Sequence, residues 1–176
     1  YLSIEREKSD PDLNKFQLER LHKRASDEIT KALQPFGYYH PRIKADLRFS
    51  DGRWLAHYDV EPGPTVKISD IVIRIQGDGA DDPKFREQIA KFPLSRGQVL
   101  NQPLYQQGKQ NFLHYAGDYG YFEFKWLKSE SDGNGQTNTV VISLIMDSGP
   151  RYRFGKVHFH QDVLDEGLMR RCLPFD

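Results

Sequence analysis

His158 and His160 are the two residues whose spacing comes nearest to that of a metal site. They lie two apart in an alternating segment, so on a strand both imidazole rings would point to the same face. A zinc site needs at least three protein ligands, and no third ligand can be identified from its spacing. We therefore predict two solvent-facing histidines, and neither a metal nor a cofactor.

The other reactive residue types occur in patterns that favour structural roles. Residues 78–82 are acidic but lack the ligand spacing of a calcium loop, and they fit a turn followed by a helix cap. Cys172 is the single cysteine, and since no histidine can be placed beside it, we expect a buried small side chain. No Ser/His/Asp set, phosphate-binding glycine loop or nucleophile elbow is present. We predict that the chain is not an enzyme.

Aromatic residues gather between positions 112 and 124, and such a group could stack on nucleobases or sugars. Their spacing follows first a helix and then a strand, which indicates that most of them belong to a core. The 25 basic and 25 acidic residues cancel, so a nucleic-acid-binding surface is not indicated. With 38% hydrophobic residues the sequence predicts a packed protein, and no apolar run approaches the roughly 20 residues of a membrane-spanning helix.

Two motifs occur twice in the same order, which predicts an internal repeat. Segment 37–43 (GYYHPRI) resembles 120–126 (GYFEFKW), and segment 63–68 (GPTVKI) resembles 149–154 (GPRYRF). The interval between copies is three residues longer for the second motif. The extra residues fall at 131–135, a longer loop than its counterpart at 50–52, and insertions belong in surface turns.

The alternation of apolar residues slips at the same place in both copies. In the first copy the alternating pair Val66 and Ile68 is followed, one position out of phase, by Ile71, Ile73 and Ile75. In the second copy Tyr152 and Phe154 are followed in the same way by Val157 and Phe159. A slip in a period-two pattern indicates a β-bulge or a strand break. Its recurrence supports the repeat independently of residue identity.

One complete unit is predicted between residues 65 and 150. A strand over 66–76 precedes a short helix that Asp81 or Asp82 caps, and a second helix runs from near Asn101 to Gly117. Two alternating strands follow, over 121–128 and 140–146. Each element is amphipathic, so the sequence predicts an α+β fold of order β-α-α-β-β, with two helices on one face of a three-stranded mixed sheet.

The same pattern divides the whole chain into three units. Residues 1–64 hold a long helical stretch and a hairpin but no opening strand, and residues 65–150 hold the complete unit. Residues 151–176 hold a first strand and the start of a helix near Leu164–Leu168. Because the N-terminus has neither an initiating Met nor a signal peptide, we expect a fragment of a longer protein.

Tandem β-α-α-β-β units joined by a Gly-Pro link resemble the POTRA (polypeptide-transport-associated) family. Three stretches are similar to the TamA family in particular: Gly37–Pro41, Gly97–Asn101 with Tyr105, and Gly149–Gly155. The resemblance covers residues 13–175. It implies the periplasmic portion of a Gram-negative outer-membrane protein, with its own C-terminal β-barrel in the full-length protein. The implied partners are an inner-membrane-anchored TamB-like protein and unfolded outer-membrane protein precursors, and no nucleic acid.

The function that follows is a non-enzymatic region for protein interaction in outer-membrane protein assembly or translocation. An open sheet edge can bind extended segments of many sequences by strand addition. Four alternatives stay open: a spacer that only orients a partner, the POTRA array of a BamA-like or two-partner secretion protein, a carbohydrate-binding domain, and a small hydrolytic domain.

The strand predicted over 121–128 is the candidate binding edge, because by resemblance the second strand of such a unit lies at the edge of the sheet. Its outward phase holds the candidate partner-binding residues Tyr121, Glu123, Lys125 and Leu127. Phe122, Phe124 and Trp126 are expected to face the helices. Leu127 is an apolar residue on the outward phase, which fits either a landing place for an extended peptide or a contact with a neighbouring unit.

Overall fold

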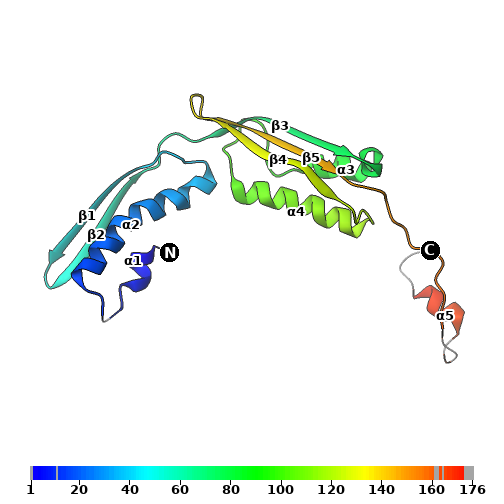
Figure 1. Cartoon of the computed structure of the whole chain (residues 1–176), viewed down its shortest axis with the longest axis horizontal. Helices are drawn as coiled ribbons and strands as arrows, with labels where there is room; N and C mark the ends of the chain where they lie inside the picture. Colours follow the sequence, from blue (N-terminus) through cyan, green and yellow to red (C-terminus); the bar gives the residue numbers. More distant parts are fainter. Residues whose placement is uncertain (1, 11, 161–162, 164, 173–176) are drawn as a thin grey trace.

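The structure is a computed structural model that describes residues 2–10, 12–160, 163 and 165–172. Figure 1 shows its elements following one another along the long axis of the molecule, with a first unit at one end, a second unit beside it and a C-terminal tail beyond. The molecule is therefore extended, and each unit has its own core. No helix among the described residues combines the length and apolar character needed to cross a membrane.

The first unit packs a long helix on a two-stranded sheet. Its elements are α1 (Ser3–Glu7), α2 (Lys15–Leu33), a 3-10 turn (Gln34–Phe36), β1 (Arg42–Ser50) and β2 (Arg53–Glu61). A capping box starts α2, because Asn14 accepts from the Gln17 N–H (3.0 Å) and Gln17 accepts from the Asn14 N–H (2.9 Å). The buried residues Leu18, Leu21 and Ala25 then pack toward the sheet.

The second unit has the predicted order of elements. These are β3 (Lys67–Gln76), a 3-10 turn (Asp78–Asp81), α3 (Pro83–Ala90), α4 (Gln102–Asp118), β4 (Lys125–Asn134) and β5 (Thr139–Asp147). The sheet order is β3-β5-β4, with β3 parallel and β4 antiparallel to β5. The predicted α+β fold with a mixed three-stranded sheet is therefore confirmed.

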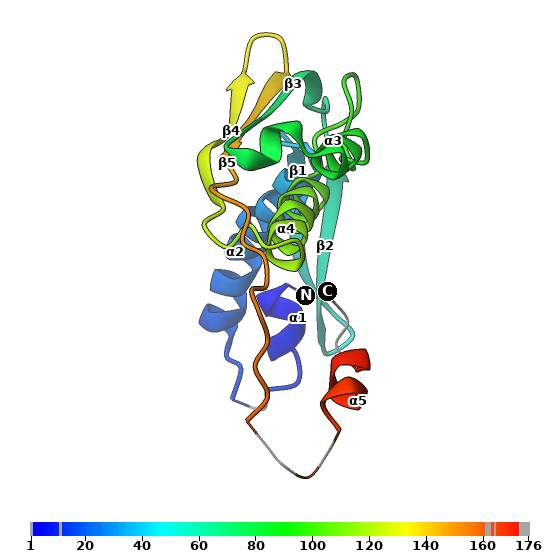
Figure 2. The same ribbon diagram turned by 90° about the vertical axis from the view of Figure 1, so that its right-hand side faces the viewer.

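Both helices of the second unit cover the same face of its sheet (Figure 2). The central strand β5 alternates strictly, burying Val140, Ile142, Leu144 and Met146. Phe85 from α3 and Phe112 from α4 are buried in one cluster with Met146. The register of β3 against β5 shifts between Ile68 and Asp70, which is the bulge that the phase slip predicts.

The two junctions between units repeat the same hydrogen bond. The Val66 N–H donates to the Gly37 carbonyl (2.8 Å), and the Tyr152 N–H donates to the Gly120 carbonyl (2.8 Å). Both glycines are left-handed, with φ of 85° and 86°. A Cβ on Gly37 would lie 2.9 Å from the Leu100 carbonyl oxygen, and one on Gly120 would lie 2.3 Å from the Tyr152 carbonyl oxygen. The matched geometry supports the internal repeat.

The C-terminal segment differs from its expected structure. Residues 151–160 form no strand, whereas α5 (Glu166–Arg171) lies where the start of a helix was expected, near Leu164–Leu168, of which residue 164 lies outside the described residues. A strand needs a neighbouring strand, and neither of the two sheets among the described residues includes this segment. Cys172 is exposed, contrary to its expected burial, because it follows a short helix at the surface.

Candidate functional site

The open edge of the second sheet is β4. Among the described residues its hydrogen-bonded neighbour is β5 alone. The outer edge of β3 is covered at its start, since the Gly97 N–H donates to the Ile68 carbonyl (2.7 Å) and the Ile68 N–H donates to the Gln98 carbonyl (2.8 Å). The main chain of β4 therefore offers the longer stretch of edge for another strand.

A β-bulge interrupts β4 at Leu127. Trp126 pairs with Met146 and Lys128 pairs with Ile145, so Leu127 is an extra residue with no partner in the register. Its side chain is 50% exposed. Bulges bend a strand and re-aim its side chains. The bulge thus explains why an apolar residue stands on the outward phase of this edge.

The four candidate residues do not all lie on β4. Lys125 and Leu127 do, but Glu123 belongs to the turn over 121–124 that precedes the strand. Tyr121 is only 2% exposed and Phe122 is 70% exposed, the reverse of the expected pattern. Tyr121 is therefore a core residue, and the edge available to a partner begins at Lys125.

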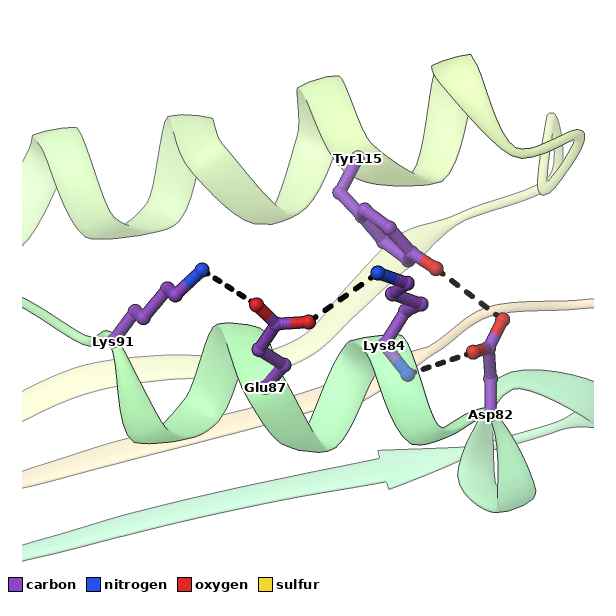
Figure 3. A network of polar contacts seen from close by, with 5 residues as sticks. All are labelled: Asp82, Lys84, Glu87, Lys91 and Tyr115. Carbon is purple, nitrogen blue, oxygen red and sulfur yellow. Dashed lines mark hydrogen bonds and ion pairs between the residues drawn. The ribbon is translucent and has the colours of Figure 1, made fainter.

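Asp82 explains why Tyr121 turns inward. The carboxylate caps α3 by accepting from the Lys84 N–H (2.9 Å), and it also accepts from the hydroxyls of Tyr121 (2.8 Å) and Tyr115 (3.3 Å). Figure 3 shows Asp82 at the start of α3, bonded to Tyr115, and Glu87 further along α3, paired with a lysine on each side. These hydrogen bonds to Asp82 fix the turn that leads into β4.

The surroundings of the Asp82 carboxyl favour its ionised form. Burial opposes ionisation of Asp82, but the hydrogen bonds from the Lys84 N–H and the Tyr121 hydroxyl outweigh burial and lower the pKa of Asp82. Burial, and then the neighbouring Asp82, raise the pKa of Tyr115 and of Tyr121. Both hydroxyls therefore remain protonated donors at neutral pH.

The beginning of β4 is held by charged and polar contacts. Lys125 lies 3.4 Å from the Asp147 carboxylate, which also accepts from the Gly149 N–H (3.0 Å). The Gly149 hydrogen bond, and after it the contact with Lys125, lower the pKa of Asp147. Glu123 accepts from the Tyr152 hydroxyl, and this bond raises the pKa of Tyr152. These contacts attach the turn before β4 to the start of the C-terminal segment.

An aromatic cluster supports β4 from the helix side. Trp126 makes edge contacts with Phe124 (5.3 Å between centroids) and Phe112 (6.1 Å), and the Lys109 ammonium lies 5.5 Å from its ring. The indole Nε1 is buried and has no acceptor among the described residues. The start of β4 therefore packs through Trp126 against the core of the second unit.

The chemistry available at this edge is main-chain hydrogen bonding. Within the described part of the chain, no group of three or more His, Cys, Asp or Glu side chains could hold a metal ion. His158 and His160 are both exposed, as expected for solvent-facing histidines.

The sequence did not predict the contact between Asp82 and Tyr121. These residues are 39 positions apart, and only the fold brings them together.

Residues 1–62 match the family model described as POTRA domain TamA domain 1. The chain is also similar to a structure of POTRA domains 3–5 of BamA from Haemophilus influenzae, with 18% identity over 91% of this chain and 61% of that one, at a TM-score of 0.47. POTRA domains 1–3 of the periplasmic domain of Omp85 from Anabaena share 17% identity over 69% of this chain and 46% of that one, at a TM-score of 0.37. The chain thus spans about three fifths of the first of these structures and less than half of the second.

The family model matches 62 of the 176 residues, all of them in the first unit. The TamA-type POTRA match lies on the first unit, and the second unit repeats the junction geometry of the first. The likeness to a TamA-type POTRA domain therefore covers the first unit, residues 1–62.

Proposed function

We propose that the chain is a non-enzymatic protein-interaction region of an outer-membrane assembly or translocation factor, and that it binds extended polypeptides by strand addition at β4. The observation that carries this proposal is the unpaired outer edge of β4, which begins at Lys125 and has the exposed Leu127 at its bulge. Strand addition uses main-chain donors and acceptors, so one edge can bind segments that differ in sequence.

The proposed partners are a TamB-like protein anchored in the inner membrane and unfolded outer-membrane protein precursors. Membrane β-strands alternate apolar and polar side chains, and an extended precursor would present both kinds to the edge. Leu127 offers one apolar contact, while Lys128 and Glu130, 3.2 Å apart, offer charges of both signs beside it. In the full-length protein the array would act next to its own C-terminal β-barrel.

A peptide with a chemically blocked main chain tests the proposal most directly. We would titrate the chain with a ten-residue peptide of alternating apolar and polar residues, and map amide shifts by NMR. Strand addition predicts shifts along residues 125–130 and loss of binding when alternate peptide nitrogens are methylated, since methylation removes the donors. A peptide with the same alternation but a different order of side chains should bind nearly as well.

Variants of the edge provide the control on the protein side. Leu127→Glu should weaken peptide binding by roughly tenfold, because it places a charge beside the added strand. Leu113→Glu changes an exposed leucine on α4, away from the edge, and should leave binding unchanged. Equal binding of the methylated and unmethylated peptides would contradict strand addition. If no peptide binds, the remaining alternative is that the chain is a spacer that only orients a partner.

A further inference from the structure

A pocket of about 500 Å³ lies where the second unit meets the first. Figure 1 shows the end of the second unit that carries the β4–β5 hairpin beside the first unit. The first unit contributes Gln34 and Tyr39 to the lining, and the second contributes the hairpin together with Val66, Leu100 and Val140. We call this space the junction pocket, because it needs residues of both units.

The last residues of β4 border the junction pocket. Residues paired across neighbouring strands point to the same face of a sheet, so the partners of the buried Ile142 and Val140 point toward the helices. These partners are Ser131 and Gly133, and both line the pocket. At the start of β4 the helix side is filled by Trp126. The helix side of β4 therefore changes from a bulky residue to small ones, and the space lies beside the small ones.

A strand added to β4 would direct side chains toward this pocket. Neighbouring strands lie about 4.8 Å apart, and residues opposite each other share a face. The residue of an added strand opposite Gly133 therefore has its side chain on the pocket side, and Gly133 itself has no side chain to block it. In strand addition the main chain gives affinity, and pockets for alternate side chains give specificity.

The lining of the junction pocket is neutral, with both apolar and polar groups. Among the described residues that line it there is no Asp, Glu, Lys or Arg, so a charged side chain would lose water without gaining an ion pair. The Tyr39 ring and the three aliphatic residues match an aromatic body. The side-chain amides of Gln34 and Asn138 have no hydrogen-bond partner among the described residues, so they can bond a hydroxyl. An aromatic ring with one hydroxyl combines these requirements.

We propose that the junction pocket binds a tyrosine side chain of the extended polypeptide that adds to β4. This inference rests on the proposed function, because strand addition is what brings the side chain to the pocket. The segments that bind would then share one tyrosine at the position opposite Gly133, while their other side chains differ. The first unit takes part in recognition through Gln34 and Tyr39, although the edge belongs to the second unit.

Three peptides with a single tyrosine test the position. Each has ten residues, the length of β4, and alternates valine with serine; the tyrosine replaces one valine near the N-terminus, at the centre or near the C-terminus. Gly133 is the last residue but one of β4, so a fully paired peptide reaches the pocket with only one of its ends. One terminal position should therefore bind roughly tenfold more tightly than the other two. Phenylalanine in that position should bind roughly threefold less tightly than tyrosine, because one hydrogen bond is lost.

Gly133→Leu fills the pocket from the protein side. A Cβ at Gly133 would meet nothing within 4 Å, so the strand accepts a side chain there. The variant should lose the preference for tyrosine and still bind the peptide that has valine throughout. Asp132→Leu is the matched control, since it adds the same side chain on the other face of β4, and it should keep the preference. If circular dichroism shows that Gly133→Leu is unfolded, Ser131→Leu on the same face replaces it.

NMR locates the bound tyrosine independently of affinity. The amide signals of Val66 and Leu100 should shift with the preferred tyrosine peptide and stay in place with the valine peptide, because both residues line the pocket and lie outside β4.

The outcomes separate this inference from the proposed function. If tyrosine and valine peptides bind equally, and methylation of their main-chain nitrogens abolishes binding, strand addition stands and the inference is wrong. A tyrosine preference that survives Gly133→Leu would place the side chain elsewhere and also overturn the inference. If no peptide binds, or if methylation has no effect, both the proposed function and the inference are refuted.

Discussion

Replacing Gly37 by alanine should destabilise the first junction more than the same replacement at Gly97. The two glycines have nearly the same left-handed backbone, with φ of 85° and 87°. They differ in their surroundings: a Cβ on Gly37 would lie 2.8 Å from Val99 Cγ1 and 2.9 Å from the Leu100 carbonyl oxygen, but one on Gly97 would meet nothing within 4 Å. The pair thus separates backbone strain from steric conflict.

The expected magnitude has two parts. An alanine in the left-handed region costs about 1–2 kcal/mol, and both variants carry this cost. At Gly37 the conflict with a backbone carbonyl forces a shift, and overpacking of this kind costs about 1–3 kcal/mol more. We therefore expect a loss of unfolding free energy of about 2–5 kcal/mol for Gly37→Ala and about 1–2 kcal/mol for Gly97→Ala.

Urea unfolding followed by tryptophan fluorescence can show which unit loses stability. The chain has one tryptophan in each unit, Trp54 on β2 and Trp126 on β4. Replacing either by phenylalanine leaves a single reporter for the other unit. Leu100 belongs to the core of the second unit, so Gly37→Ala should shift the Trp126 midpoint although the substitution lies outside that unit. If Gly37→Ala costs no more than Gly97→Ala, the close approach at the junction is not under steric constraint.

Three further substitutions, one with a matched control, test the core and the hydrogen bonds of the second unit. Asp82→Asn should lower the free energy of unfolding. Because the pKa of Asp82 in the folded chain lies below its usual 3.8, the charged carboxylate stabilises the fold above about pH 4, and this stabilisation is lost as the pH falls further. The difference in unfolding free energy between the variant and the unaltered chain should therefore shrink as the pH is lowered. Ser148→Ala should cost about 1–3 kcal/mol in urea unfolding, since it leaves the buried Gly79 N–H, now 2.8 Å from Ser148 Oγ, without an acceptor. Phe112→Ala should cost about 3–5 kcal/mol and Leu113→Ala much less, because Phe112 is 1% exposed; similar thermal shifts for both would contradict the assigned core.

Periodicity in the sequence was sufficient to predict most of the second unit. The alternation of Val140, Ile142, Leu144 and Met146 requires a strand with one buried face, and the structure buries all four. The phase slip after Ile68 predicted a bulge because a one-residue shift would otherwise send every later side chain to the wrong face. These features depend on neighbours along the chain, which a sequence displays directly.

Features that depend on distant partners were predicted less well. The alternation of Phe122, Phe124 and Trp126 suggested a strand from residue 121, but the hydrogen bond from Tyr121 to Asp82 turns its side chain inward and delays the strand to Lys125. Residues 151–160 carry a strand pattern without a strand, because a pattern cannot supply the neighbouring main chain that a strand needs. The second strand does lie at the edge of the sheet, but it begins at Lys125 and runs to Asn134 instead of covering 121–128, and binding at this edge stays a prediction.

The parallel pairing of β3 with β5 also sets an order of folding. Ser69 Oγ on β3 donates to the Val140 carbonyl on β5, 71 residues further along the chain, whereas β1 and β2 are joined by a tight turn. Local contacts form early and distant ones late, because closing a long loop costs entropy before any contact forms. A chain that emerges from its N-terminus can complete the β1–β2 hairpin at once. Its strand β3 must then wait, with its apolar residues exposed, until β5 has been made and can pair with it.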